Sequence, residues 1–189
     1  PKLIKVIGKA GRGEGQFNKP SGLSIDKWNN LYVTDTNNNR IQKFDSNDNY
    51  IYATSNTMND LEKPINIALS HHREAYVVNG SKNSICIFDG NNGKKLWPLA
   101  NFKGLICGMT FNNMNNSLYV AVPYDLSIVR LNRNLDSVQK YDIKGWESIK
   151  DTYPMMTIDS KQRLYVTLPE DRKVVVYDIN DDFNYLGEI

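Results

Sequence analysis

Two adjacent histidines, two cysteines and many carboxylates are the side chains in this sequence that could do chemistry. A zinc ion is usually bound by several His or Cys side chains that converge from separate elements. His71 and His72 are neighbours in a predicted turn, and adjacent residues rarely reach the same ion. Cys86 and Cys107 each lie within a short apolar stretch, which is typical of buried free thiols. We therefore predict no metal site of this kind and no disulfide framework.

The common catalytic motifs are missing from the sequence. It contains no nucleophile elbow, no phosphate-binding loop and no HExxH metalloprotease motif. We therefore predict no catalytic residues and no cofactor, and we expect a protein that is not an enzyme. A calcium site stays open, because Asp and Asn supply the oxygen ligands that calcium prefers and both are abundant.

Asp35, Asn38 and Arg40 form the most distinctive polar group. An Asp at the end of a strand can accept hydrogen bonds from the N–H groups of the following turn. Arg40 follows Asp35 across the same turn and could pair with its carboxylate, and Asn38 lies between them in an Asn-rich stretch. We predict that these three residues fix a structural turn, with Arg40 also a candidate partner contact.

An internal repeat organises the chain. Residues 20–45 align without a gap on residues 64–89, with a shift of 44. The matching pairs are Pro20/Pro64, Leu23/Ile67, Ile25/Leu69, Tyr32/Tyr76, Val33/Val77, Asn39/Asn83, Ile41/Ile85, Phe44/Phe88 and Asp45/Asp89. Two further copies follow, so that four central tyrosines are spaced 44, 43 and 46 residues apart, at Tyr32, Tyr76, Tyr119 and Tyr165.

Each copy is predicted to form four β-strands. In the first copy, residues 22–26, 31–34, 40–44 and 50–54 are apolar or alternating segments separated by turn residues. Four short antiparallel strands in about 44 residues are typical of a propeller blade, which buries its faces by stacking on its neighbours. The predicted fold is therefore all-β, a β-propeller with about four four-stranded blades, at about residues 18–57, 62–101, 105–143 and 152–189. We expect the central tyrosines in the core between blades.

The first copy carries a family resemblance. Gly15-Gln16-Phe17 precedes its first strand, and its turn reads Asp35-Thr-Asn-Asn-Asn-Arg-Ile41. Both features resemble the NHL repeat. A WD40 propeller is disfavoured, because none of the three tryptophans is followed by Asp. The second copy has Asn79 and Ser84 in place of Asp35 and Arg40, and the last two copies keep only the pattern of strands.

The resemblance implies a six-bladed ring, of which this chain would supply about four blades. Residues 2–8 are predicted to be the outer strand of a preceding or closing blade, and residues 183–189 begin another such strand. We therefore expect residues 1–189 to be one partial propeller domain. Missing blades would complete it, or the chain would associate with itself through exposed blade edges.

Charge and hydropathy argue against two classes of protein. With 23 basic and 21 acidic residues the net charge is +2, so a dedicated nucleic-acid surface is not expected. No apolar run approaches the ~18 residues of a membrane-spanning helix. The sequence does not fix a location, although the resemblance favours an extracellular or cell-surface protein.

The predicted function is binding. We expect a non-catalytic scaffold that contacts a protein, or a surface ligand, through the loops of one face. Those loops are residues 35–40, 79–84, 123–126 and 169–172, together with 58–63, 101–104 and 146–152. Exposed Trp, Tyr and Arg side chains supply much of the energy of interfaces. The candidate contact residues are therefore Arg40, Tyr124, Asp125, Trp146 and Arg172.

Two alternatives come from the same resemblance. Some six-bladed relatives are metal-dependent lyases or hydrolases, and the decisive ligands could lie outside this chain. Some NHL domains bind single-stranded RNA, which requires a positive face with exposed aromatic side chains. The basic loop residues of this chain lie among acidic ones, which are Glu62, Glu170 and Asp171.

Overall fold

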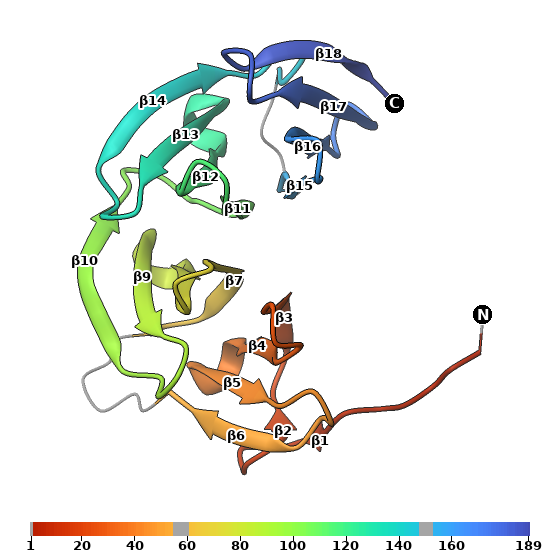
Figure 1. Ribbon diagram of the computed structural model, residues 1–189, viewed down its shortest axis with the longest axis vertical. Helices are drawn as coiled ribbons and strands as arrows, with labels where there is room; N and C mark the ends of the chain where they lie inside the picture. The colour runs from red at the N-terminus through yellow and green to blue at the C-terminus, as the bar shows by residue number, and fades with distance from the viewer. Residues whose placement is uncertain (1, 55–60, 148–152) are drawn as a thin grey trace. The chain divides into compact units, whose positions relative to one another are not determined.

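The described residues form four sheets of four strands each and one two-stranded sheet (Figure 1). The structure is a computed structural model that describes residues 2–54, 61–147 and 153–189, with the backbone alone for residues 97–99. In every sheet the strands neighbour one another in chain order, as in a meander. The all-β prediction is therefore confirmed.

The strands have the following bounds. The first sheet contains β3 (Pro20–Ile25), β4 (Leu31–Asp35), β5 (Arg40–Phe44) and β6 (Tyr50–Ala53). The second contains β7 (Pro64–Leu69), β8 (Glu74–Asn79), β9 (Ser84–Asp89) and β10 (Lys95–Asn101). The third contains β11 (Met109–Asn112), β12 (Ser117–Val122), β13 (Ser127–Asn132) and β14 (Ser137–Asp142). The fourth contains β15 (Met156–Ile158), β16 (Arg163–Leu168), β17 (Lys173–Asp178) and β18 (Asn184–Glu188).

Short elements connect and precede these sheets. Single 3₁₀ turns join the second and third strands of the first three sheets, at η1 (Thr36–Asn38), η2 (Gly80–Lys82) and η3 (Pro123–Asp125). Before β3, the two-residue strands β1 (Lys9–Ala10) and β2 (Gln16–Phe17) pair in parallel. Residues 2–8, predicted to be an outer strand, form no strand in the structure. Within the described parts of the chain, no helix has the length and apolar character needed to cross a membrane.

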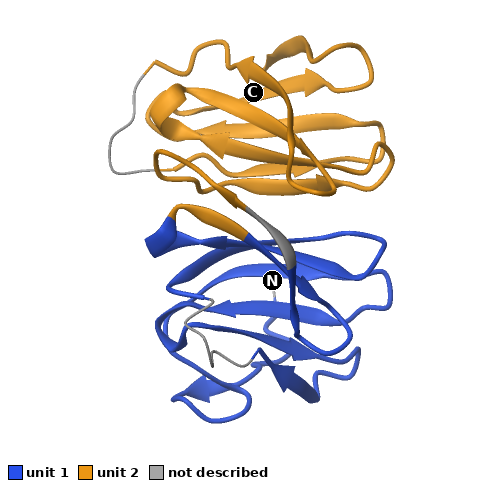
Figure 2. Cartoon of the chain, turned by 90° about the vertical axis from the view of Figure 1, so that its left-hand side faces the viewer, with its two compact units in different colours: residues 1–82, 86–96 blue, residues 83–85, 97–189 orange. Residues whose placement is uncertain are grey.

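The chain divides into two compact units (Figure 2). Unit 1 comprises residues 1–82 and 86–96, and unit 2 comprises residues 83–85 and 97–189. In unit 1, β7 of the second sheet packs on β3 and β4 of the first. In unit 2, β15 of the fourth sheet packs on β11 of the third. Within each unit, the apolar faces of its two sheets are therefore buried against one another, as in stacked blades.

The Asn-rich turns fold by a shared device. Asp26 Oδ1 accepts hydrogen bonds from the N–H groups of Trp28 and Asn30, both at 2.9 Å. Asn29, between these two residues, has a left-handed backbone with φ of 64°. The same two bonds, to the second and fourth residues onward, recur at Asp45, Asn132 and Asp159. Asp and Asn are frequent between the strands because their side chains mimic a backbone turn.

The central tyrosines lie in the core, with one exception. Tyr32, Tyr76 and Tyr119 are buried, as predicted. Tyr165 is only half-buried, which corrects the expectation that all four tyrosines lie in the core. It lines an open pocket on the fourth sheet, so its face of the sheet is not closed over by the rest of unit 2.

Both cysteines are free and buried, as the apolar stretches predicted. Cys107 Sγ donates to the carbonyl of Pro154 at 3.5 Å. Burial raises the pKa of the Cys107 thiol to about 12. The thiol is therefore inert at neutral pH, since the thiolate is the reactive form.

Candidate functional site

The turn between β4 and β5 is built around the carboxylate of Asp35. Its Oδ1 accepts a hydrogen bond from the backbone N–H of Asn18 at 2.7 Å. Its Oδ2 accepts from Asn38 Nδ2 at 2.8 Å, Arg40 Nε at 2.9 Å and Gln42 Nε2 at 3.1 Å. The Asp35 side chain is wholly buried, and the Arg40 side chain is nearly so. A buried carboxylate is stable when it is paired and its oxygens are hydrogen-bonded, and both conditions hold here.

Arg40 ties this turn to the segment before β3. Its Nη2 donates to the carbonyl oxygens of Gly13 at 2.7 Å and Gln16 at 2.8 Å. Three of the five N–H donors of the guanidinium are thus used within the chain. Arg40 also lines a polar pocket of about 280 Å³ with Arg12 and residues 37–39. The exposed charge of this pocket is that of Arg12, since Arg40 is committed to the turn.

The second copy keeps one part of this arrangement. Asn79 Oδ1 accepts a hydrogen bond from the N–H of Glu62 at 2.8 Å. Asp35 accepts the equivalent bond from the N–H of Asn18. Asn79 follows Asp35 by 44 residues, and Glu62 follows Asn18 by the same number. Ser84 stands in the place of Arg40 and cannot pair with a carboxylate. The second copy therefore keeps the hydrogen bond that holds the segment before its first strand, and it lacks the ion pair.

The turn between β12 and β13 has different side chains at the positions of Asp35 and Arg40. Val122 and Ser127 flank it, and Leu126 adopts the left-handed conformation with φ of 50°. Tyr124, at the tip, is 73% exposed. Asp125 beside it forms an ion pair with Lys140, with Oδ2 and Nζ 3.3 Å apart and both side chains largely in water. Two of the predicted contact residues, Tyr124 and Asp125, are therefore neighbours on the surface of unit 2.

A groove of about 190 Å³ lies under this turn, and we call it the Tyr124 groove. Its lining residues are Asn101, Phe102, Lys103, Gly104, Val122, Tyr124, Asp125 and Val129. Gly104 is required for its shape, because a Cβ atom there would lie 2.8 Å from the Cβ of Tyr124. The groove combines an apolar floor with a polar rim, an arrangement typical of protein interfaces.

Sequence reasoning found part of this groove. It named the loop at 101–104 and the two turn residues Tyr124 and Asp125. It missed Val122 and Val129, which line the groove from β12 and β13, and Lys140 of β14, which forms the ion pair with Asp125. Val129 and Lys140 are brought near the turn by strand pairing, which places them opposite one another on β13 and β14. The spacing of the copies was the signal that could have located them, because it fixes which strand follows each turn.

The prediction that Trp146 is a contact residue was wrong. It was expected to be an exposed contact, but it is 6% exposed and belongs to the core of unit 2. Its backbone N–H donates to the carbonyl of Ile143 at 3.1 Å, in a turn that folds the indole back onto the sheets. Burial of so large an apolar side chain is favourable by about 25 cal/mol per Å², and this explains its position.

The other predicted positions are dispersed. Arg172 is exposed at the turn between β16 and β17, with φ of 54°, and does not line the Tyr124 groove. Of the predicted loops, residues 58–60 and 148–152 lie outside the described residues. His71 and His72 are exposed in the turn between β7 and β8. Over residues 2–54, 61–147 and 153–189, no group of three or more His, Cys, Asp and Glu could hold a metal ion.

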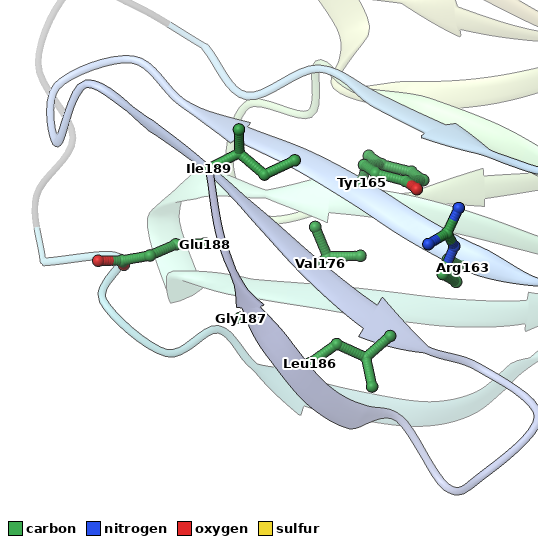
Figure 3. Close-up of a pocket in the computed structure, with 7 residues that line it drawn as sticks. All are labelled: Arg163, Tyr165, Val176, Leu186, Gly187, Glu188 and Ile189. Atoms are coloured by element: carbon green, nitrogen blue, oxygen red, sulfur yellow. The ribbon is translucent and has the colours of Figure 1, made fainter.

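A second hollow lies on the fourth sheet (Figure 3). It has a volume of about 220 Å³, and the side chains of Tyr165, Val176 and Leu186 project into it from β16, β17 and β18. Arg163 lies over the Tyr165 ring, with its guanidinium carbon 5.5 Å from the ring centroid. Arg163 and Glu188 also line this hollow, so apolar and charged side chains are mixed in it, as they are in the Tyr124 groove.

The fold of the chain is that of a β-propeller. Meander sheets of four strands, stacked face to face in each unit, are propeller blades. Comparison with solved structures shows the same fold. Virginiamycin B lyase from Staphylococcus aureus superposes with a TM-score of 0.68 at 16% sequence identity, over 88% of this chain and 54% of the lyase.

The first blade matches a known repeat. The NHL repeat matches residues 17–44. Protein brain tumor of Drosophila melanogaster is 51% identical over 39 residues, and Protein lin-41 of Caenorhabditis elegans is 40% identical over 48 residues. These matches cover 21% and 25% of this chain but 4% of each relative. Residues 17–44 are therefore similar to the NHL repeat, as the sequence indicated.

Proposed function

We propose that this chain is a protein-binding propeller module that holds a short segment of its partner in the Tyr124 groove. The observation that carries the proposal is the exposure of Tyr124 above an apolar floor. A Tyr side chain offers a large, rigid contact area with few rotatable bonds, and aromatic residues are enriched at binding hot spots. Nothing in the turn requires an aromatic residue there, since Asn37 occupies the same place in the first turn.

The surroundings of Tyr124 support the same role. Val122 and Val129 provide apolar surface, while Lys103 and Asp125 place opposite charges on the rim. Charged rims of this kind direct partner choice more than they add affinity. An extended peptide with one aromatic or aliphatic side chain fits this combination best, because the groove is small and open on one side.

The test is selection of peptide ligands. A displayed library of random peptides is panned on the whole chain. Titration calorimetry then measures the affinity of the selected peptides for the wild type and for two variants, Tyr124→Ala and Tyr153→Ala. Tyr124→Ala is expected to weaken binding by about 30-fold or more, the effect of truncating a hot-spot residue. The matched control is Tyr153→Ala, which removes another exposed tyrosine of unit 2 that does not line the groove.

The outcomes separate cleanly. Loss of affinity in Tyr124→Ala together with full affinity in Tyr153→Ala supports the proposal. Equal affinity of the wild-type chain and Tyr124→Ala, for every selected peptide, would show that the groove is not the binding site. Matching urea unfolding curves for the three proteins establish that binding and not folding has changed.

A further inference from the structure

In the first blade, two hydrogen bonds hold the segment before β3 against the turn between β4 and β5. The N–H of Asn18 donates to Asp35 Oδ1 at 2.7 Å. The carbonyl of Asn18 accepts from the N–H of Asn37, the second residue of η1, at 3.0 Å. The acceptor for the Asn18 N–H is therefore a side-chain oxygen of the residue just before the 3₁₀ turn.

The second blade makes the same two bonds. The N–H of Glu62 donates to Asn79 Oδ1 at 2.8 Å. The carbonyl of Glu62 accepts from the N–H of Ser81, the second residue of η2, at 3.1 Å. A side-chain oxygen thus holds the segment before the first strand in both blades. It belongs to a carboxylate in the first blade and to a carboxamide in the second.

The third blade lacks this side-chain oxygen. Val122 lies just before η3, as Asp35 lies just before η1. Leu105 precedes Val122 by 17 residues, which is also the spacing of the bonded pairs in the first two blades. The N–H of Leu105 and that of Tyr124, the second residue of η3, form no hydrogen bond with any described residue. Two N–H groups that the other blades satisfy internally are therefore available beside Val122.

Ser127 adds a third donor at this place. Strand pairing sets Val122 opposite Ser127, as it sets Asp35 opposite Arg40. Because directly opposite side chains lie on the same face of a sheet, the Ser127 hydroxyl lies on the side of the sheet where Val122 lines the groove. This hydroxyl is wholly buried and has no hydrogen-bond partner among the described residues. A buried hydroxyl without a partner is costly, and an acceptor supplied here would remove that cost.

The Tyr124 groove lies where these donors are free. Val122, Tyr124 and residues 101–104 line it, and Leu105 directly follows that segment. All of these residues belong to unit 2. The groove is therefore the space that remains where the segment before β11 is not bonded to the turn.

The charges around the groove favour an anion. Lys103 is exposed in its lining. Asp125, the acidic residue of the lining, is already paired with Lys140. Hydrogen bonds from N–H and O–H donors to an ionised acceptor are roughly twice as strong as those to a neutral one. In the first blade the group at this place is itself a carboxylate, that of Asp35.

We infer that the segment bound in the Tyr124 groove carries an aspartate, whose carboxylate takes the place that the Asp35 side chain has in the first blade. The inference rests on the proposed function of the groove and names the group that anchors the ligand. The Leu105 N–H and the Ser127 hydroxyl are the donors to this carboxylate, and Lys103 balances its charge. The N–H of Tyr124 is left for a main-chain carbonyl of the segment.

The experiment follows the amide signals of the whole chain, labelled with ¹⁵N, by NMR. The probe is acetyl-aspartate amide, a single aspartate with both ends blocked, so that its side chain holds its only carboxylate. We expect saturable shifts of the amide signals of Leu105 and Tyr124. Acetyl-asparagine amide has the same shape without the charge and is expected to bind about 10-fold more weakly. Tighter binding of acetyl-alanine, whose carboxylate is a chain end, would overturn the assignment to an aspartate side chain.

Two substitutions of Val122 make the comparison sharper. Val122→Asn gives the third turn the side chain of Asn79, and the second blade already has a serine, Ser84, at the place of Ser127. The new carboxamide is expected to accept the Leu105 N–H, to slow the hydrogen exchange of this amide and to abolish the shifts caused by the probe. Val122→Leu has nearly the shape of Val122→Asn without an acceptor and is expected to keep binding the probe.

Two results would overturn the inference. One is an absence of shifts at Leu105 and Tyr124 in the wild type, and the other is equal affinity of the two Val122 variants for the probe. The comparison of the two blocked amino acids uses the wild type alone, so it does not depend on the folding of a variant. Selected peptides that bind in the groove without an acidic residue would overturn this inference and leave the proposed function intact. Binding of the probe at Leu105, with no peptide selected from the library, would do the reverse.

Discussion

The turns of the first and third blades have the same backbone and different chemistry. Both are a single 3₁₀ turn followed by one residue with left-handed backbone, Asn39 in the first and Leu126 in the third. In both, the N–H of that residue bonds to the carbonyl of the first turn residue, Thr36 or Pro123. The first turn is fixed by the buried pair of Asp35 and Arg40, whereas the third has no ion pair at these positions.

The difference shows that the shape of the turn does not require the ion pair. Leu126 adopts a conformation that costs a non-Gly residue about 1–2 kcal/mol, and its side chain packs on the core of unit 2. Packing thus replaces the polar cluster as the source of stability in the third turn. Tyr124 at the tip is then not needed to hold the turn, and a binding role there has little cost in stability.

The largest expected effect is that of Asp35→Ala. The substitution leaves the nearly buried Arg40 charge without its carboxylate partner and the N–H of Asn18 without its acceptor. It also removes one of the two acceptors of Gln42 Nε2. Breaking a buried pair in this way costs about 3–5 kcal/mol of the free energy of unfolding. Urea unfolding followed by circular dichroism measures the loss.

Asp35→Asn is the matched control, because the second blade has Asn79 at this position. It keeps an acceptor for the Asn18 N–H and should be less destabilising than Asp35→Ala. If Asp35→Ala costs less than about 0.5 kcal/mol, the value for a simple surface change, then the first turn does not depend on its ion pair for stability.

Asn39→Leu places the residue of the third turn in the first and should have an intermediate effect. The left-handed backbone then carries a Leu side chain without the packing that supports Leu126, and the bond from the Lys63 N–H to Asn39 Oδ1 is lost. We expect a loss of about 1–2 kcal/mol in the free energy of unfolding. Asn39→Asp, which tolerates the same backbone and keeps an acceptor, should remain close to the wild type. Equal stability of the two variants would contradict the argument.

The repeat made most of the fold accessible from the sequence. Alternating apolar residues and Asn-rich turns identified the strands, because both signals are local. The central tyrosines at positions 32, 76 and 119 were placed in the core because one period relates them. Tyr165 is less buried than the other three tyrosines. Burial at this position depends on a neighbouring blade, and the local sequence does not encode that.

The candidate site was less accessible for the same physical reason. Tyr124 and Asp125 were found because they lie in a turn, where the sequence reports exposure well. Trp146 was misplaced, since its loop folds back onto the core through contacts with residues distant in the chain. Lys140 was missed because its relation to Asp125 is set by strand pairing, and no spacing within the turn encodes it.

A smaller effect is expected from the exposed pair in the third turn. Asp125 and Lys140 are joined at 3.3 Å, but both side chains are largely in water. A double-mutant cycle with Asp125→Asn and Lys140→Ala should give a coupling energy of about 0.2–1 kcal/mol. The corresponding cycle for Asp35 and Arg40 should give a clearly larger value. Similar coupling in the two cycles would mean that burial does not distinguish the two turns.

The smallest expected effect concerns a third kind of carboxylate, that of Asp159, which is only partly buried and accepts several hydrogen bonds. Its Oδ1 accepts from the N–H groups of Lys161 and Arg163, and its Oδ2 from Arg163 Nε at 2.8 Å. The backbone bond from Arg163 is the main cause that lowers the pKa of Asp159 from 3.8 to about 2. Because folding favours the ionised form, the carboxylate stabilises the fold fully above pH 3.8, and this contribution disappears as the pH falls to about 2. The difference in urea midpoint between the wild type and Asp159→Asn should therefore shrink across this interval, and a difference that stays constant would show that the ionised form has no preference for the folded turn.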